Sequence, residues 1–345
     1  MKRFVRPYLC LLGSLLLAAL NPILRRLPWR TLWIINPGTA DDVDAYAPRW
    51  ARPILSWRAL WPAGILFVPD HGLSLVLGAS SPSSTLRREP DACERLLRAA
   101  ERYRCRRIAL NGDLPSIVSN HRLWPQGDRF VRRPMGTVFM IEHNVRESAQ
   151  RLGLSSPRVL VVGAGYTGAL CANRLAALGF EVMALDTRSD RNEALDPKVR
   201  FLLPDAAEIQ AANVVVLLTP TGDSGALQVI EHLRSGVAVI SDTHPKLSMA
   251  MVNRLRDQQV HVFESALTRD GTFFFPKIPR WPSDTIPGCV SQALVEATAQ
   301  RRISDQEDFD REAALSLRAR LDEPPRRIRS SVVHPDSGLC AKASR

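Results

Sequence analysis

The segment from residue 158 to residue 168 limits the possible folds most, because it joins an apolar run to a glycine-rich turn and then to a helical stretch. The turn has the pattern Gly-x-Gly-x-x-Gly and consists of Gly163, Ala164, Gly165, Tyr166, Thr167 and Gly168. Gly163 can make the tight turn, Gly165 lets a pyrophosphate approach the backbone, and Gly168 permits close packing of helix on strand. The sequence therefore predicts that these six residues bind a dinucleotide.

Residues at the ends of two later predicted strands extend this prediction. Asp186 closes a predicted strand 23 residues after Gly163, where a carboxylate can accept hydrogen bonds from the adenosine ribose and so favours NAD. Arg188 could instead bind the 2′-phosphate of NADP. Thr219 and Pro220 follow a later strand and could border the cofactor, although Pro-Thr-Gly is also ordinary turn chemistry. The sequence thus predicts NAD or NADP as cofactor.

The second half of the chain alternates apolar runs with helical stretches. The predicted strands are 158–162, 181–186, 199–203, 213–218, 237–242 and 260–264, and the predicted helices are 168–178, 226–234 and 247–258. Strands that are apolar throughout are typical of a parallel sheet covered on both faces. We expect an α/β fold, with a Rossmann-type doubly wound parallel sheet preceded by a smaller α/β domain.

The pattern of the first half of the chain predicts the smaller α/β domain. Its expected strands are 64–68, 73–77 and 107–110, and its expected helices are 91–104 and 136–152. We divide the chain into a basic and apolar N-terminal extension (1–35), a small α/β substrate domain (36–155), an NAD(P)-binding domain with a late helix (156–305), and a C-terminal helix with a disordered basic tail (306–345).

The net charge of +11 lies at the two ends of the chain. Residues 1–30 hold six basic and no acidic residues, and residues 324–345 hold five basic and one acidic, so the body carries only +1. This distribution argues against a nucleic-acid partner and favours a membrane surface. The apolar run 8–20 is too short to span a bilayer. It could be an interfacial helix, a weak anchor extended by 32–35, a signal peptide with a poor cleavage site, a wrongly included start or a packed extension. We expect a cytoplasmic protein, either free or peripheral at the inner face of a membrane, and the oligomeric state is left open.

Six scattered cysteines lack any Cys-x-x-Cys pair, so we predict no metal site and reduced thiols. Cys289 follows Pro-Gly and falls in the first turn of a predicted helix, where the helix dipole would lower its pKa and make it a nucleophile. The alternative is a buried, small apolar residue. Cys171, inside the first Rossmann helix, is expected to pack in the core.

The segment after the strand 237–242 offers two further catalytic candidates. His244 and Lys246 follow the carboxyl end of that strand and are placed for proton transfer or contact with an anion. The alternative is a solvated loop.

The order of these parts resembles the long-chain acyl-(acyl-carrier-protein) reductases, which make fatty aldehydes from acyl thioesters. The similar stretches are 110–117 (Leu-Asn-Gly-Asp-Leu-Pro-Ser-Ile), Arg129-Phe130, 149–154, 240–246, and Gly288-Cys289 before an acidic-apolar helix. The resemblance implies that Cys289 attacks an acyl thioester and that hydride from the cofactor releases the aldehyde. The family's turn reads Gly-Ala-Thr-Gly-x-x-Gly, however, and its residue at the place of Asp186 is not acidic.

Three functions therefore remain open. The first is an NAD(P)-dependent reductase of an acyl thioester with Cys289 as nucleophile. The second is a cysteine-independent dehydrogenase of a small hydroxy or amino acid, similar in domain order to shikimate dehydrogenase. The third is a non-catalytic dinucleotide-binding protein at a membrane surface.

Overall fold

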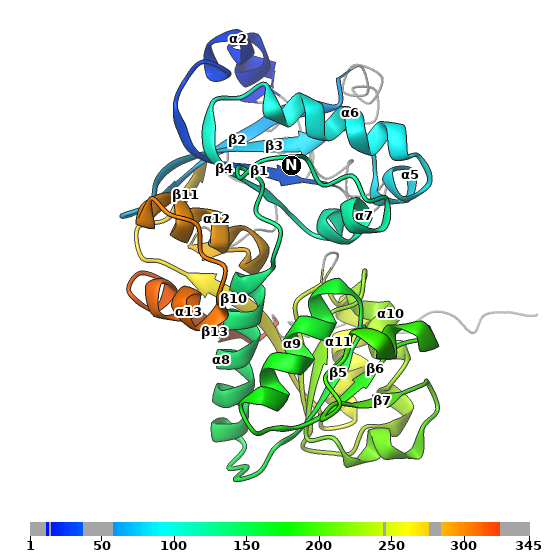
Figure 1. The fold of residues 1–345 in the computed structure, drawn as a ribbon. Coiled ribbons are helices and arrows are strands. Elements are labelled where there is room, and N and C mark those ends of the chain that lie inside the picture. Colours follow the sequence, from blue (N-terminus) through cyan, green and yellow to red (C-terminus); the bar gives the residue numbers. More distant parts are fainter. Residues whose placement is uncertain (1–11, 14, 37–57, 244–245, 276–283, 325–345) are drawn as a thin grey trace, which may run out of the picture.

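The computed structural model describes residues 12–13, 15–36, 58–243, 246–275 and 284–324. They form two sheets joined by a long helix, α8 (Met135–Arg151) (Figure 1). The expected basic tail from residue 325 onward lies outside the described residues. Among the described residues no helix is both long and apolar enough to cross a membrane.

The first domain is built on a five-stranded sheet with the order β11-β2-β3-β1-β4. Its strands are β1 (Trp29–Ile35), β2 (Leu60–Val68), β3 (Gly72–Ala79), β4 (Cys105–Leu110) and β11 (Phe273–Phe275). β1 runs parallel to β3 and β4, whereas β2 pairs antiparallel with β3 and with β11.

Two features of this sheet correct the expected domain boundaries. Residues 29–35, assigned to an N-terminal extension, form its central strand β1, with Leu32 and Ile34 fully buried. Apolar residues on both faces are what a central parallel strand requires. The edge strand β11 comes from the second half of the chain, so that half contributes a strand to the sheet of the first domain.

Helices cover both faces of this sheet. One face packs on α2 (Asn21–Leu24), α5 (Ser83–Arg88), α6 (Pro90–Glu101) and α7 (Leu114–Asn120), through a core that includes Leu32, Leu75 and Tyr103. The other face packs on α12 (Gly288–Ala299), which contacts β1 and β4. The late helix α12 therefore belongs as much to the first domain as to the second.

The second sheet confirms the predicted fold class. Its parallel strands are β5 (Arg158–Val162), β6 (Glu181–Leu185), β7 (Arg200–Leu202), β8 (Val214–Leu217), β9 (Ala238–Ser241) and β10 (His261–Thr268). Their order is β10-β9-β8-β5-β6-β7, the doubly wound order of a Rossmann domain. β12 (Thr285–Ile286) and β13 (Arg318–Asp322) pair antiparallel with β10.

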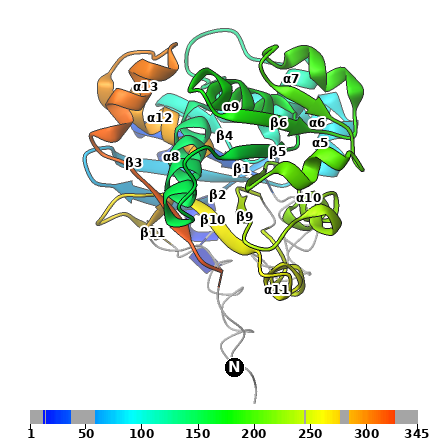
Figure 2. The same ribbon diagram turned by 90° about the horizontal axis from the view of Figure 1, so that it is seen from below.

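Helices cover both faces of the Rossmann sheet as well. α9 (Tyr166–Ala177) lies on one face, and α10 (Gly222–Leu227) and α11 (Met249–Asp257) lie on the other (Figure 2). Short 3-10 helices at Ser189–Ala194, Ala207–Ala211 and Ile230–His232 fill the connections. The helix expected at 226–234 is thus replaced by the end of α10 and a single 3-10 turn.

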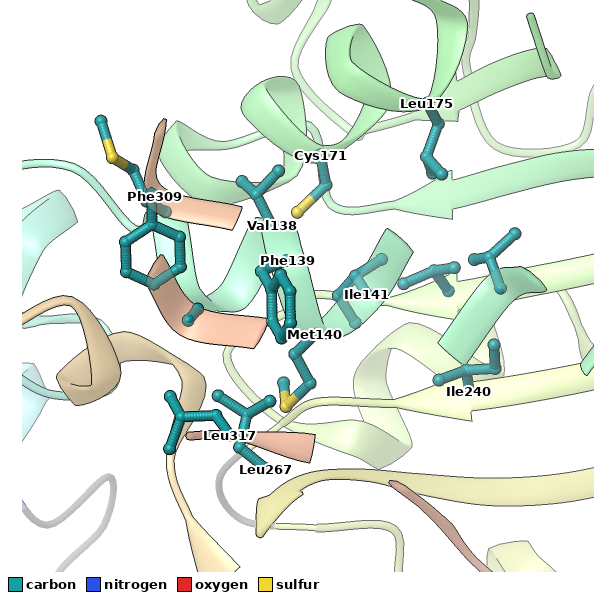
Figure 3. Close-up of a cluster of buried hydrophobic side chains, with 14 of the residues drawn as sticks. Val138, Phe139, Met140, Ile141, Cys171, Leu175, Ile240, Leu267, Phe309 and Leu317 are labelled. Atoms are coloured by element: carbon teal, nitrogen blue, oxygen red, sulfur yellow. The ribbon is translucent and has the colours of Figure 1, made fainter. Parts of the chain in front are cut away.

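The helix α8 holds the two domains together. Val138, Phe139, Met140 and Ile141 pack against residues of α9, β9, β10 and α13 (Gln306–Ala314), as Figure 3 shows. Cys171 of α9 is 1% exposed within this cluster, which confirms its expected packing role. Since one continuous core spans both domains, the surfaces that face each other across the gap are held in a defined arrangement.

Candidate functional site

A cleft of about 590 Å³ separates the carboxyl edge of the Rossmann sheet from the first domain. The predicted site residues on its walls are Gly163, Gly165, Tyr166, Thr167, Gly168, Asp186, Arg188, Thr219, Pro220 and Cys289. Ala164 is 1% exposed and supports the turn from beneath. The structure therefore brings nearly all the predicted cofactor residues to one cavity.

The glycine-rich turn has the three properties that its pattern predicts. Gly163 adopts a φ of +96°, and a Cβ atom there would lie 2.9 Å from the carbonyl oxygen of Leu218. A Cβ on Gly168 would lie 1.8 Å from the carbonyl oxygen of Gly163. At Gly165, by contrast, a Cβ would meet no atom within 4 Å. The turn is crowded toward the protein and open toward the cleft, as a pyrophosphate would need.

The aromatic side chain of the turn fixes it to the neighbouring segment. The Tyr166 hydroxyl donates to the backbone carbonyl oxygen of Arg132, just before α8. Burial raises the pKa of this phenol, and the nearby cations Arg133 and Arg132 only partly oppose the shift. Tyr166 thus acts as a neutral link between α9 and the entrance to α8.

Asp186 and Arg188 differ in what they offer to a ligand. Asp186 lies in the cleft at the end of β6, and its Oδ1 accepts a hydrogen bond from the backbone N–H of Arg188 at 3.1 Å. The exposed guanidinium of Arg188 pairs with both carboxylate oxygens of Asp190, at 3.1 and 2.5 Å. This pairing lowers the pKa of Asp190. Arg188 would have to leave its own turn to meet a 2′-phosphate.

At the end of β8, the side chain of Thr219 completes a turn. Its Oγ1 donates to the carbonyl oxygen of Thr221 at 2.7 Å, and only 9% of the residue is exposed. Thr221 in turn caps α10, since its Oγ1 accepts from the backbone N–H of Ser224 at 3.2 Å. These bonds are those of a structural turn that borders the cleft together with Pro220.

Cys289 reaches the cleft at the start of α12. Two contacts hold this helix in place: a close crossing in which Gly288 faces Thr137 of α8, and a buried ion pair between Arg107 of β4 and Glu296, 2.7 Å apart. The thiol of Cys289 donates to Oδ1 of Asn111 at 2.7 Å. Cys289 is partly exposed, and its thiol proton is hydrogen-bonded to an amide oxygen.

The electrostatics of this thiol differ from the sequence expectation. Burial raises the pKa of Cys289 to about 12. The backbone N–H of Gly112 and those at the helix start lower it, while the Asp242 carboxylate raises it further. The prediction of a lowered pKa at the helix start was wrong, because the loss of water around the sulfur outweighs the helix dipole.

Asp242 opens the segment 242–246 that the sequence analysis placed at the carboxyl end of a strand, where only His244 and Lys246 were named as candidates. It follows β9 and lines both the main cleft and a small adjoining cavity of about 30 Å³. Burial raises the pKa of Asp242 to about 6, and the Lys246 cation limits the shift. Its position at the carboxyl end of a parallel strand is a signal that could have identified it.

Of the two other predicted catalytic residues, the structure describes only Lys246, which does not line the main cleft. Lys246 lines the small cavity and forms an ion pair with Glu264 of β10. His244 lies outside the described residues. No group of three metal-ligating side chains occurs in the part of the chain that the structure describes.

The first domain supplies a polar wall that sequence reasoning also missed. The carboxylate of Asp113 accepts hydrogen bonds from Asn36 at 2.8 Å, Ser83 at 2.9 Å and Arg87 at 2.6 Å. Arg87, Asn111 and Asp113 all line the cleft. The Asn-Gly-Asp segment after β4 is among the stretches that carry the family resemblance. The structure places this segment on the wall of the cleft.

Comparison with known proteins yields likenesses to solved structures only. No family model and no curated protein matches this chain. A dipicolinate synthase chain from Bacillus halodurans is 16% identical, with a TM-score of 0.31, over 49% of this chain and 60% of that one. Mycobacterium tuberculosis 3-hydroxyisobutyrate dehydrogenase is 16% identical, with a TM-score of 0.28, over 33% of this chain and 41% of that one.

An imine reductase from a Pseudomonas species is 19% identical, with a TM-score of 0.28, over 35% of this chain and 47% of that one. All three matches span less than two thirds of the solved structures. None of the three is an acyl-(acyl-carrier-protein) reductase, and that resemblance stays a prediction.

Proposed function

We propose that this chain is an NAD(P)-dependent oxidoreductase that holds its substrate in the cleft between the two domains. The observation that carries the proposal is the open space in front of Gly165, at the start of α9, on the wall of a cleft of about 590 Å³. The first N–H groups of a helix have no partner within the helix and attract anions. The turn and the start of α9 would bind the pyrophosphate of the cofactor.

Asp186 supports NAD ahead of NADP. Its carboxylate lies in the cleft and would accept hydrogen bonds from the ribose hydroxyls, but it would repel a 2′-phosphate. Arg188 is already paired with Asp190. When bound, the nicotinamide supplies or accepts the hydride, and the residues of the chain position the substrate and move its protons.

For the substrate, the position of Cys289 supports an acyl thioester. Sγ would attack the thioester carbonyl carbon, the carbon–sulfur bond would break, and the leaving thiolate would take up the proton lost by Cys289. Reduction of the acyl-cysteine by hydride would then release an aldehyde and return the Cys289 thiolate, which is reprotonated. Asp242 faces the same cleft and could carry the proton in both directions.

The raised pKa of Cys289 favours a second candidate. A thiol whose proton is bound to Asn111 is a poor nucleophile, so the chain could be a cysteine-independent dehydrogenase of a small hydroxy or amino acid. In that reaction a carboxyl group such as Asp242, or Lys246 or His244, would exchange the proton of the substrate hydroxyl. A non-catalytic dinucleotide-binding protein is the third candidate.

The test begins with fluorescence titration of NADH and NADPH into the full chain, as wild type and as Cys289→Ala. Both forms should bind cofactor, and NADH more tightly. Intact-mass measurement after exposure to palmitoyl-coenzyme A should then show an acyl adduct on the wild type alone. Binding without an adduct would favour the second candidate, and substitution of Asp242, Lys246 or His244 would then stop hydride transfer. Absence of cofactor binding would refute the proposal itself.

A further inference from the structure

The N-terminal helical segment presents an apolar face that the rest of the described chain leaves uncovered. Residues 15–19 and 21–24 are helical, and the exposed apolar side chains follow at steps of three or four residues. These side chains, which we call the leucine face, are Leu12, Leu16, Leu20, Ile23 and Leu27, with exposed fractions of 62, 59, 40, 57 and 42%. Steps of three and four place residues on one side of a helix.

The opposite side of this segment is fixed to the first domain. Leu17 and Leu24 are 5% exposed and belong to its core. The buried Asn21 accepts a hydrogen bond from the Tyr103 hydroxyl at 2.6 Å, and the indole N–H of Trp29 donates to the carbonyl oxygen of Leu24 at 2.7 Å. Because both polar bonds lie on the inner side, the leucine face is directed outward.

A group of arginines surrounds this segment. Arg26 and Arg30 are exposed next to it. The backbone N–H of Arg104 donates to the carbonyl oxygen of Arg25, which brings the exposed Arg102 and Arg104, just before β4, and Arg106, within β4, close to the segment. We call these five residues the arginine collar. Within the described residues none of their side chains has a hydrogen bond or an ion pair. Glu101 is the one acidic side chain in residues 101–107.

We propose that the leucine face and the arginine collar dock the protein on the surface of an anionic lipid membrane. Apolar side chains enter the boundary between headgroups and acyl chains, and the exposed cations meet the lipid phosphates. No helix in the described residues could span the bilayer, so the segment would lie in the plane of the interface. A second protein with an apolar groove would not require the cationic surroundings, which is why we favour lipid.

The fold places this surface away from the Rossmann sheet. In Figure 1, α2 lies at the outer end of the first domain, while β5, β6 and β7 lie at the opposite end of the molecule. Docking would therefore leave the sheet of the dinucleotide-binding domain in solution. The inference is independent of the proposed function and would hold for any substrate.

The experiment is flotation of the full chain with vesicles of phosphatidylcholine alone or with added phosphatidylglycerol. We expect binding to the anionic vesicles only, with a loss of roughly fivefold for each arginine replaced in Arg26→Gln, Arg104→Gln and Arg106→Gln. The corresponding lysine variants should retain binding, since the lipid charge is the partner. The triple variant Leu12→Gln, Leu16→Gln and Ile23→Gln should lose at least about tenfold.

A matched control carries Leu203→Gln, Leu227→Gln and Leu315→Gln, which are exposed leucines outside the leucine face. It should float like the wild type. Retained NADH binding or an unchanged thermal midpoint would show that each variant is folded. Equal binding to neutral vesicles, no binding at all, or flotation of the leucine-face variant like wild type would each overturn the proposal. A lipid-free dimer that the leucine-face variant abolishes would assign the surface to a second copy instead.

Discussion

Two helices begin at the same cleft, and they make opposite use of their first turns. α9 starts after Gly165, where a Cβ atom would meet nothing within 4 Å. α12 starts at Gly288, where a Cβ atom would lie 2.9 Å from the Cα and from Oγ1 of Thr137. Both helix starts carry the same partial positive charge. One faces space for an anion, and the other holds a half-buried thiol whose pKa rises to about 12.

A helix start therefore binds charge only where the packing around it leaves it open. At α12, the crossing with α8 and the bond to Asn111 crowd the sulfur, and desolvation exceeds the effect of the dipole. At α9 the tight contacts lie on the inner side, at Gly163 and Gly168. Local sequence predicts both helix starts correctly but does not reveal how crowded each one is.

The strongest test of this contrast is the reactivity of Cys289. A thiol with a pKa about 3 units above that of an ordinary cysteine has a thiolate fraction roughly a thousandfold smaller at neutral pH. Because a thiolate of higher pKa is also more nucleophilic, alkylation of the cofactor-free protein by iodoacetamide should be slower by about 30-fold to 60-fold than that of an unfolded control peptide. Peptide mass spectrometry over a pH series measures this rate. If the alkylation rate of Cys289 reached half of its maximum below pH about 8, the helix dipole would prevail over desolvation at the start of α12.

The second test closes the open helix start. Gly165→Asp places a carboxylate where the pyrophosphate would bind, so the affinity for NADH should fall by at least about 100-fold, with little change in the thermal midpoint. Gly165→Ala is the milder partner, expected to bind more weakly than wild type but better than the aspartate variant. Calorimetric titration measures both. Unchanged NADH affinity in the aspartate variant would mean that α9 is not the anion site.

The third test makes one substitution at both helix starts. Gly288→Ala should lower the free energy of unfolding by about 1–3 kcal/mol, because the new methyl group must push α12 away from α8. Gly165→Ala should change it by less than about 0.5 kcal/mol, since its methyl group faces open space. Urea unfolding of the two variants beside wild type measures the difference. Equal effects would show that the helix crossing can relax.

Much of the fold could be predicted because buried parallel strands are apolar throughout. The strands β5, β6, β8 and β9 stand within one residue of their predicted bounds at each end. β1 was assigned to the extension because residues 32–35 continue an apolar N-terminus, and its partners lie some 40 to 75 residues away. β11 has only three residues and β13 alternates charged with apolar side chains, and both pair with distant segments that local patterning does not specify.

The candidate site divides in the same way. The glycine turn and Asp186 could be predicted, because they occur at fixed spacing within one βαβ unit. Asn111 and Asp242 reach the cleft from two different sheets, and only the packing of α8 and α12 between the domains brings those sheet edges together. The pKa of Cys289 depends on the same packing.

Asp242 provides the last and smallest test. Its carboxylate is the negative charge that raises the pKa of Cys289 at the start of α12. Its pKa of about 6 lies above the unfolded value, so ionisation costs the folded state stability. That cost is absent below pH about 4, grows as the pH rises, and is complete above pH about 6. Asp242→Asn should therefore stabilise the protein near pH 7.5 and change its stability by almost nothing near pH 4. The gain near pH 7.5 should be only about 1 kcal/mol, because solvent in the cleft screens part of the charge. Urea unfolding of wild type and variant at both pH values measures the change, and subtraction removes the contribution of the other titrating groups. A stabilisation equal at both pH values would mean that folding does not raise the pKa of Asp242.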